Sequence, residues 1–251
     1  KTYDLLNRFD QQNRAYEVLS IAKKASEEKK NKLEQAKWLY NSAKWDFSHN
    51  KSENLDFYLD KALENLKNAI NCKQVKNEDC SPLEVKILIL KGRIASNKSE
   101  IEIAINNFTQ AYEISVSLEE KSLACDCLMR MGSLKRRLAE FEDALDDFQK
   151  ALTYAREENN TRHVYRATTY IGLVEKHNHR YEIAEKYFAE ALNNSEKNSL
   201  DENYYKGNIA DLRLQEGRYK EAEELFRECL EKAEELRNSR GIRIIKGQLA
   251  E

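Results

Sequence analysis

The sequence predicts an all-α fold in which antiparallel helix pairs stack into a solenoid, and three observations point to it. The 251 residues include only seven glycines and one proline, too few for the many tight turns of a β-sandwich or barrel. Charged residues make up 34% of the chain and apolar residues 41%, a mixture typical of amphipathic helices and not of disorder. A motif of small residues and phenylalanine also recurs every 40 residues through the middle of the chain.

The recurring motif starts at a small residue on one helix and ends in three residues on the next. An alanine follows the first position after twelve residues, a phenylalanine follows four residues later, and another small residue follows three after that. Weaker copies lie before residue 80, and the fourth clear copy has alanine in place of glycine. The four clear copies are Gly92, Ala104, Phe108 and Ala111; Gly132, Ala144, Phe148 and Ala151; Gly172, Ala184, Phe188 and Ala191; and Ala210, Ala222, Phe226 and Cys229.

Elementary packing explains why these residue types recur. Residues three and four positions apart share a helix face, so the small residues and the phenylalanine of the second helix lie on one side. The glycine of the first helix lets the second helix approach closely, and the phenylalanine fills the gap between neighbouring pairs. One pair cannot bury such a face alone, so we expect the pairs to stack.

We expect one continuous array over residues 1–251, of about five to six repeats, with both ends falling inside a repeat. A partial repeat covers 1–30, full repeats cover about 31–78, 81–118, 119–158, 161–198 and 200–238, and a second partial repeat covers 239–251. The expected helices are 12–29, 32–47, 54–73, 82–97, 100–116, 119–137, 140–157, 162–177, 180–196, 201–215, 218–237 and 240–251.

Four of these helices carry a serine followed three residues later by glutamate near their predicted start. This spacing is the capping box, in which the serine side chain accepts a hydrogen bond from a backbone N–H of the first turn. The first of the four is followed by Pro82, the residue type preferred at the first helical position. The predicted caps are Ser81, Ser99, Ser117 and Ser199.

The repeated motif resembles that of the tetratricopeptide repeat family. Ile171 and Gly172 match the Leu-Gly pair of the family's first helix, Trp38 and Trp45 match its two large positions, and Ala-x3-Phe-x2-Ala matches its second helix. The chain departs from the family in its period, which is longer than the usual value of about 34 residues, and in the missing proline at the end of each repeat.

The resemblance implies a right-handed superhelix in which first helices line a concave groove. It also implies that this groove binds a peptide or a helix of another protein. The long period is similar to that of variants in signalling scaffolds and in bacterial sensor and regulator proteins. The function implied is therefore protein–protein interaction, in the scaffold or the sensing and regulatory domain of a larger signalling protein.

Counting from the glycine positions assigns the residues that would face this groove. They are basic with apolar interruptions, which favours an acidic-hydrophobic peptide as the partner. The Lys135-Arg136-Arg137 run can also be a solvated helix end favoured by the helix dipole. The Lys-and-Asn clamp of chaperone-binding family members is not reproduced, so a chaperone C-terminus is disfavoured. The expected groove residues are Arg93, Arg130, Ser133, Arg136, Arg137, Arg166, Tyr170, Lys176, Tyr204 and Asn208.

We expect no catalytic residue, no cofactor and no metal site. The sequence has no glycine-rich phosphate loop, and no acid–base pair stands out. His177 and His179, with His163 nearby in sequence, would need a third ligand in the right geometry to hold a metal. The five cysteines are odd in number and irregularly spaced, so we expect buried small residues in a reducing, cytoplasmic compartment.

Two other functions stay open as alternatives. One is a nucleic-acid-binding helical repeat, which the balance of 42 basic and 44 acidic residues disfavours. The other is the regulatory domain of an enzyme whose catalytic part lies outside this chain. No apolar run approaches the roughly 18 residues of a membrane span, so no membrane contact is expected. Repeat faces exposed at the ends would allow end-to-end self-association.

Overall fold

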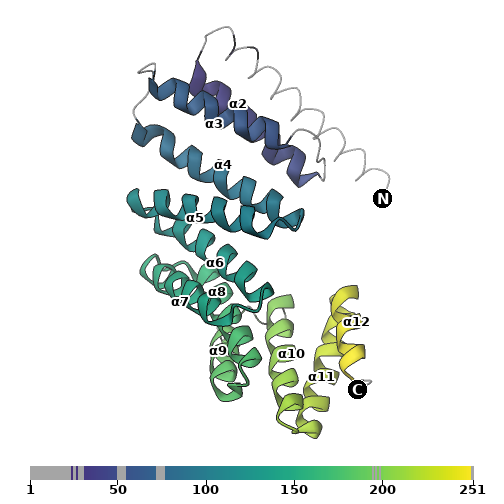
Figure 1. Ribbon diagram of the computed structural model, residues 1–251. Helices are drawn as coiled ribbons and strands as arrows, with labels where there is room; N and C mark the ends of the chain where they lie inside the picture. The colour runs from purple at the N-terminus through teal and green to yellow at the C-terminus, as the bar shows by residue number, and fades with distance from the viewer. Residues whose placement is uncertain are drawn as a thin grey trace, which may run out of the picture. The chain divides into compact units, whose positions relative to one another are not determined.

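The computed structural model describes residues 24, 27, 31–49, 55–71, 77–193, 195, 197 and 199–249. These residues form eleven α-helices and no strand, and most successive helices, from α2 to α5 and from α7 to α12, pack against each other as antiparallel neighbours (Figure 1). The helices are α2 (Lys32–Ser48), α3 (Leu55–Asn71), α4 (Asn77–Asn97), α5 (Ile101–Ser117), α6 (Lys121–Arg137), α7 (Phe141–Glu157), α8 (Thr161–His177), α9 (Tyr181–Asn193), α10 (Leu200–Gln215), α11 (Tyr219–Glu235) and α12 (Ser239–Gln248).

The all-α prediction is confirmed for the described residues, and so are nearly all the helix boundaries. Ends differ from the predicted ones by three residues or fewer, with one exception. That exception is α4, which begins at Asn77 and not at residue 82. The helix predicted over 12–29 lies almost entirely outside the described residues.

Constant helix length explains the long repeat period. Helices α5 to α8 each contain 17 residues, and the turns after α5, α6 and α7 each contain three. A helix therefore begins every 20 residues along this stretch, and a helix pair occupies 40. The excess over the usual family period lies in longer helices, since three-residue turns leave no spare chain.

The turns share one backbone conformation, in which the middle residue has a positive φ. In the turn after α6, the N–H of Glu140 donates to the carbonyl of Lys135 at 3.0 Å, and that of Ala139 donates to Arg136 at 3.2 Å. This is the Schellman pattern, which satisfies the last carbonyls of a helix and usually has glycine at the left-handed position. Here that position is held by Ser99, Glu119, Ala139, Asn159, His179, Gly217 and Arg237.

Three of the four predicted serine caps are wrong, and the turns explain why. Ser99 is the left-handed residue of its turn, and Ser117 is the last residue of α5, with its hydroxyl donating to the carbonyl of Ile114. Ser81 and Pro82 lie inside α4. Ser199 does cap α10, since its Oγ accepts from the N–H of Glu202 at 3.0 Å. Most of these turns are therefore stabilised by the helix that ends there, and not by a cap on the helix that follows.

The glycine and phenylalanine positions of the motif meet directly within each pair. A Cβ added to Gly132 would lie 2.8 Å from Cε1 of Phe148, and one added to Gly92 would lie 2.6 Å from Cε1 of Phe108. Phe148 is fully buried, and its ring stacks on Tyr170 of the next pair, with centroids 4.9 Å apart. Both roles predicted for the motif are therefore confirmed here: close approach within a pair and filling between pairs.

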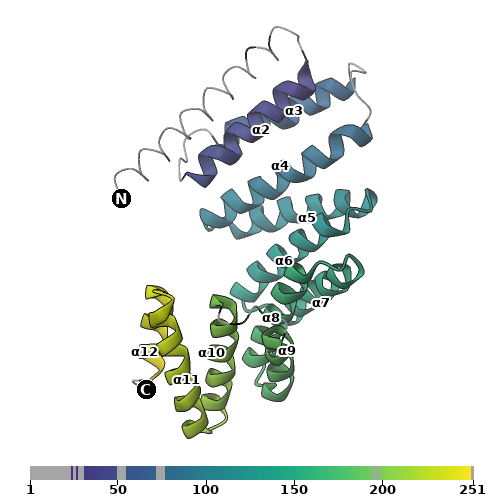
Figure 2. The ribbon, with the colours of Figure 1, turned by 180° about the vertical axis from the view of Figure 1, so that it is seen from behind.

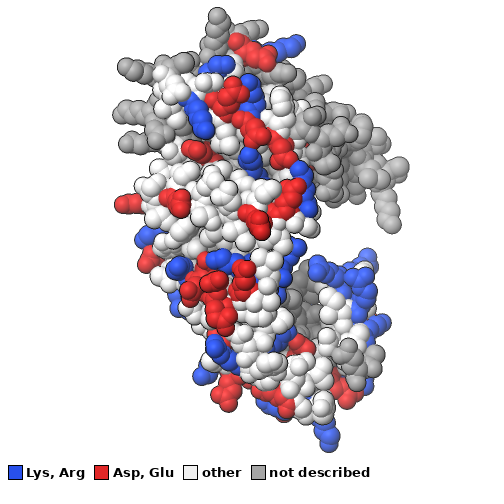
Figure 3. Space-filling model, viewed as in Figure 1, with Lys and Arg blue, Asp and Glu red and all other residues white. Residues whose placement is uncertain are grey.

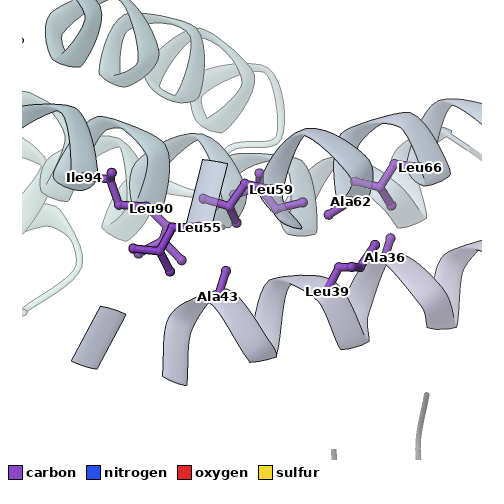
Figure 4. Close-up of a cluster of buried hydrophobic side chains, with 10 residues drawn as sticks. Ala36, Leu39, Ala43, Leu55, Leu59, Ala62, Leu66, Leu90 and Ile94 are labelled. Carbon is purple, nitrogen blue, oxygen red and sulfur yellow. The ribbon is translucent and has the colours of Figure 1, made fainter. Parts of the chain in front are cut away.

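The chain divides into two compact units, Lys1–Cys127 and Leu128–Glu251, with the division inside α6. In the first unit, small and aliphatic side chains of α2 point toward α3 and α4, and Leu59 and Ala62 lie fully buried among them (Figure 4). In the second unit, α10, α11 and α12 lie side by side (Figure 2), and the buried side chains of Ala210, Phe226 and Ile245 form one cluster among them. The single continuous array stays a prediction.

We predict that Gly132→Ala lowers the free energy of unfolding by about 1–3 kcal/mol, because the buried Phe148 ring has no room to retreat from the new methyl group. Urea denaturation followed by circular dichroism measures the change. Gly247→Ala is the matched control: Gly247 is also helical, but its Cβ would meet nothing within 4 Å, so that variant gains about 1 kcal/mol of helix propensity. Equal stabilisation by both variants would contradict the close contact.

We also predict that Ala139→Gly raises the free energy of unfolding by about 0.5–1 kcal/mol. A left-handed conformation costs an L-residue about 1–2 kcal/mol, and glycine avoids this cost while losing part of the gain to its freer unfolded state. The same change inside a helix, Ala189→Gly in α9, should instead cost about 1 kcal/mol. Thermal melts of the two variants should therefore shift in opposite directions.

Candidate functional site

A pocket of about 290 Å³ lies between α10 and α12 in the second unit. Phe226 of α11 lines it from behind the two helices, and Lys176 at the end of α8 lines its edge. Helices α8 and α10 are first helices of their pairs, and α12 follows α11 as the next first helix. The residues around the pocket are Lys176, Leu200, Asn203, Tyr204, Gly207, Asn208, Asp211, Phe226, Asn238, Gly241, Ile244, Ile245 and Gln248.

Helical periodicity places these residues on two facing stripes. On α10 the lining positions recur at intervals of three and four, and the same spacing holds on α12. Three large apolar side chains on the stripes are about half exposed: Leu200 at 52%, Tyr204 at 49% and Ile244 at 52%. Apolar side chains gathered around an open pocket are typical of a surface that another molecule covers.

Gly207 lies in the middle of α10 and lines the pocket. A Cβ at Gly207 would meet nothing within 4 Å, in contrast to the crowded glycines at 92, 132 and 172. Glycine inside a helix costs about 1 kcal/mol relative to alanine. Packing gives no reason for this glycine, and its effect is to leave the pocket unfilled.

The charged groups at the edge of the pocket neutralise each other. Nζ of Lys176 lies 2.5 Å from Oδ2 of Asp211, and the two side chains are each about one-fifth exposed. This ion pair joins α8 to α10. Asp211 is the only acidic residue that lines the pocket within the described part of the chain.

Amide side chains supply the remaining polar groups of the pocket. Nδ2 of Asn203 donates to the carbonyl of Cys229 at 3.0 Å, and Nδ2 of Asn208 donates to that of Tyr204 at 2.9 Å. Oδ1 of Asn238 accepts from the N–H of Gly241 at 3.1 Å, which caps α12. An amide has one acceptor and two donor hydrogens, so those of Asn208 and Asn238, which are not buried, can still bond to a peptide backbone.

The pocket brings together three of the ten predicted groove residues: Lys176, Tyr204 and Asn208. The guanidinium of Arg93, in the first unit, lies over the ring of Phe47 at 4.7 Å. Tyr170 packs on Phe148 between two pairs and is a packing residue in this structure.

The remaining predicted residues lie on α6 and α8. Arg130, Ser133, Arg136 and Arg166 are half-buried, and Arg137 is exposed. None of these five lines the pocket between α10 and α12.

The histidine and cysteine positions have structural partners. His177 stacks on Phe141 with centroids 5.2 Å apart, and burial lowers its pKa, with nearby Lys176, Arg136 and His179 acting in the same direction. Nδ1 of His179 lies 2.8 Å from Oη of Tyr181.

The expectation of buried small cysteines is confirmed for Cys125, Cys127 and Cys229. Burial raises the pKa of Cys229 to about 11, so this thiol is a poor nucleophile. Cys72 and the side chain of Cys80 lie outside the described residues. Within the described part of the chain, no helix has an apolar stretch long enough to cross a bilayer.

Sequence reasoning missed most of the pocket. Residues of α12, such as Ile244 and Gln248, were not predicted to face the groove, because groove residues were assigned only in full repeats and this helix belongs to an incomplete one. Leu200 lies at the helix start, outside the turns that were counted from Ala210. Gly207 carried a usable signal, since it is a helical glycine three residues before the position that the motif already assigns to a small residue.

Comparisons with known proteins agree with this architecture. Two tetratricopeptide repeat models match residues 124–197 and 206–240. No curated protein matches the sequence. Among solved structures, BtubC from P. vanneervenii is 14% identical, with 91% of each chain covered and a TM-score of 0.74.

Two regulators have the same fold. The Rap conjugation gene regulator of plasmid pLS20, solved with the Phr* peptide, is 18% identical with a TM-score of 0.61; the match covers 88% of this chain and 59% of that one. The quorum sensor NprR from B. thuringiensis, in its apo form, is 15% identical with a TM-score of 0.67, covering 97% of this chain and 66% of that one. The chain thus spans about three fifths to two thirds of these regulators. The repeat motif, the helix pairs and the two matched models together support a helical repeat protein of the tetratricopeptide repeat kind.

Proposed function

We propose that the chain is a protein-interaction module, the scaffold or sensing part of a larger regulatory protein. It binds a peptide or a short helix of another protein in the pocket between α10 and α12. The observation that carries this proposal is Gly207, a helical glycine whose missing side chain keeps the pocket open. Free, buried cysteines fit a module of the reducing cytoplasm.

The size and lining of the pocket suit a peptide anchor. Its volume of about 290 Å³ is near the lower end of ligand pockets, enough for one or two large side chains of a peptide. Tyr204, Phe226 and Ile244 offer the apolar contact that such anchors need. The amides of Asn208 and Asn238, which are not buried, can bond to the backbone of the same peptide.

The comparisons support a peptide as the partner without identifying it. The Rap regulator of pLS20 was solved with the Phr* peptide, and another Rap protein, 18% identical to this chain, with competence and sporulation factor. Both have the helical repeat fold described above, which supports the proposal through shared architecture.

We predict that Gly207→Phe abolishes peptide binding without unfolding the chain, because the new ring fills open space in the pocket. Peptides enriched on the folded chain from a phage-displayed random library serve as probes, labelled and measured by fluorescence polarisation. We expect a loss of at least about ten-fold in affinity, which corresponds to about 1.4 kcal/mol.

Gly247→Phe is the matched control for this experiment. Gly247 is also a helical glycine with open space around its Cβ, but it does not line the pocket. The Gly247→Phe variant should bind the selected peptides as tightly as the parent chain does. Peptides that bind Gly207→Phe with parental affinity, or a library from which nothing is enriched, would refute the pocket as the binding site.

A further inference from the structure

Three arginines stand together where α11 turns into α12. Arg237 is the left-handed residue of the turn, and Arg240 and Arg243 lie in the first half of α12. All three side chains are exposed, and within the described residues none of them makes an ion pair or a hydrogen bond. Figure 3 shows Lys and Arg side chains gathered on α12.

The position of these arginines runs against helix electrostatics. The N-terminus of a helix carries a partial positive charge, which favours acidic residues and disfavours basic ones. Helices α7, α9, α10 and α11 of the same unit each have an acidic residue in the first turn, whereas α8 and α12 have none. The dipole and the three guanidinium groups therefore add to one positive region, and no acid of the described residues forms an ion pair with these arginines.

This positive region borders the pocket. Arg240 lies one helical turn before Ile244, which lines the pocket. Arg237 is the immediate neighbour of Asn238, another lining residue. Arg237 and Arg240 are thus neighbours of the apolar pocket, and Arg243 follows Arg240 by three residues on the outer side of α12. The pocket's own acid, Asp211, is already held by Lys176.

We propose that the pocket takes an acidic-hydrophobic peptide segment, with an apolar side chain in the pocket and neighbouring carboxylates on Arg237, Arg240 and Arg243. The proposal rests on the proposed function and names the chemistry of the partner. Guanidinium forks suit carboxylates in pairs of hydrogen bonds, and the cations give the peptide a direction along α12. A polyanion such as nucleic acid fits less well, because the pocket beside the arginines has several large apolar residues and its lysine, Lys176, is already paired with Asp211.

The test compares the parent chain with the triple variant Arg237→Glu, Arg240→Glu, Arg243→Glu on peptides from a random phage-displayed library. Peptides enriched on the parent should combine a large apolar residue with Asp or Glu. The variant should bind these peptides at least about ten-fold more weakly than the parent does. The difference in affinity should shrink as salt is added. Selection on the variant should enrich Lys and Arg instead.

A control variant with the same change in charge is Lys150→Glu, Lys186→Glu, Lys220→Glu. These lysines are exposed on the second helices α7, α9 and α11 and do not line the pocket. The control should keep parental affinity. Glutamate suits a helix N-terminus, so the arginine variant should melt at no lower temperature than the parent. If the glutamate variant does melt at a lower temperature, Arg→Gln at the same three positions tests the role of the charge instead.

The outcomes separate this inference from the function on which it rests. Enriched peptides that need an open Gly207 but show no acidic preference, or bind the arginine variant normally, overturn the inference and leave the peptide module standing. Acidic peptides whose affinity falls with the arginine variant but not with Gly207→Phe also overturn the inference. In that case the apolar anchor and the charges do not belong to one binding site. A library that yields no peptide dependent on Gly207 overturns both. Dimerisation of the parent chain that the arginine variant abolishes would assign the arginines to a second copy and overturn the peptide assignment.

Discussion

The contact between a phenylalanine ring and the bare backbone of a glycine sets the spacing of this structure. Phe148 rests against Gly132 within its own pair and stacks on Tyr170 of the next, so one side chain holds three helices. The last copy differs, since Ala210 replaces the glycine. Phe226 of that copy is buried against Ala210 and also lines the pocket. The candidate site therefore lies where the repeating contact is altered.

The pocket combines this packing with an unusual charge distribution. Its apolar residues come from α10, α11 and α12, and its one ion pair, Lys176 with Asp211, links α10 back to α8. The acids of the second unit lie mostly in first turns and on second helices, where dipole and solvent suit them. The starts of α8 and α12 both carry basic residues and no acid in a place that favours acids, and at α12 this positive charge lies beside the apolar pocket.

The repeat could be predicted from sequence because its residues have strong physical reasons. Glycine at 132 and phenylalanine at 148 are required by close packing, and the repeat spacing predicted every described helix end except the start of α4 to within three residues. The turns could not be found this way, since a left-handed Ala139 looks like any helical alanine. Most of the pocket could not be predicted, because it depends on the tertiary arrangement of α12 beside α10. It also depends on Gly207, whose missing side chain leaves open space in the pocket.

The three-residue turns between α5 and α8 have a consequence for how such a chain can change over time. A single inserted residue would rotate the rest of a helix by about 100°, and the turn has no slack to restore the register. Length in this stretch can therefore vary only in whole helices, through gain or loss of 20- or 40-residue blocks. The connections 49–54, 72–76 and 194–199 are longer than three residues, and small insertions can be absorbed there.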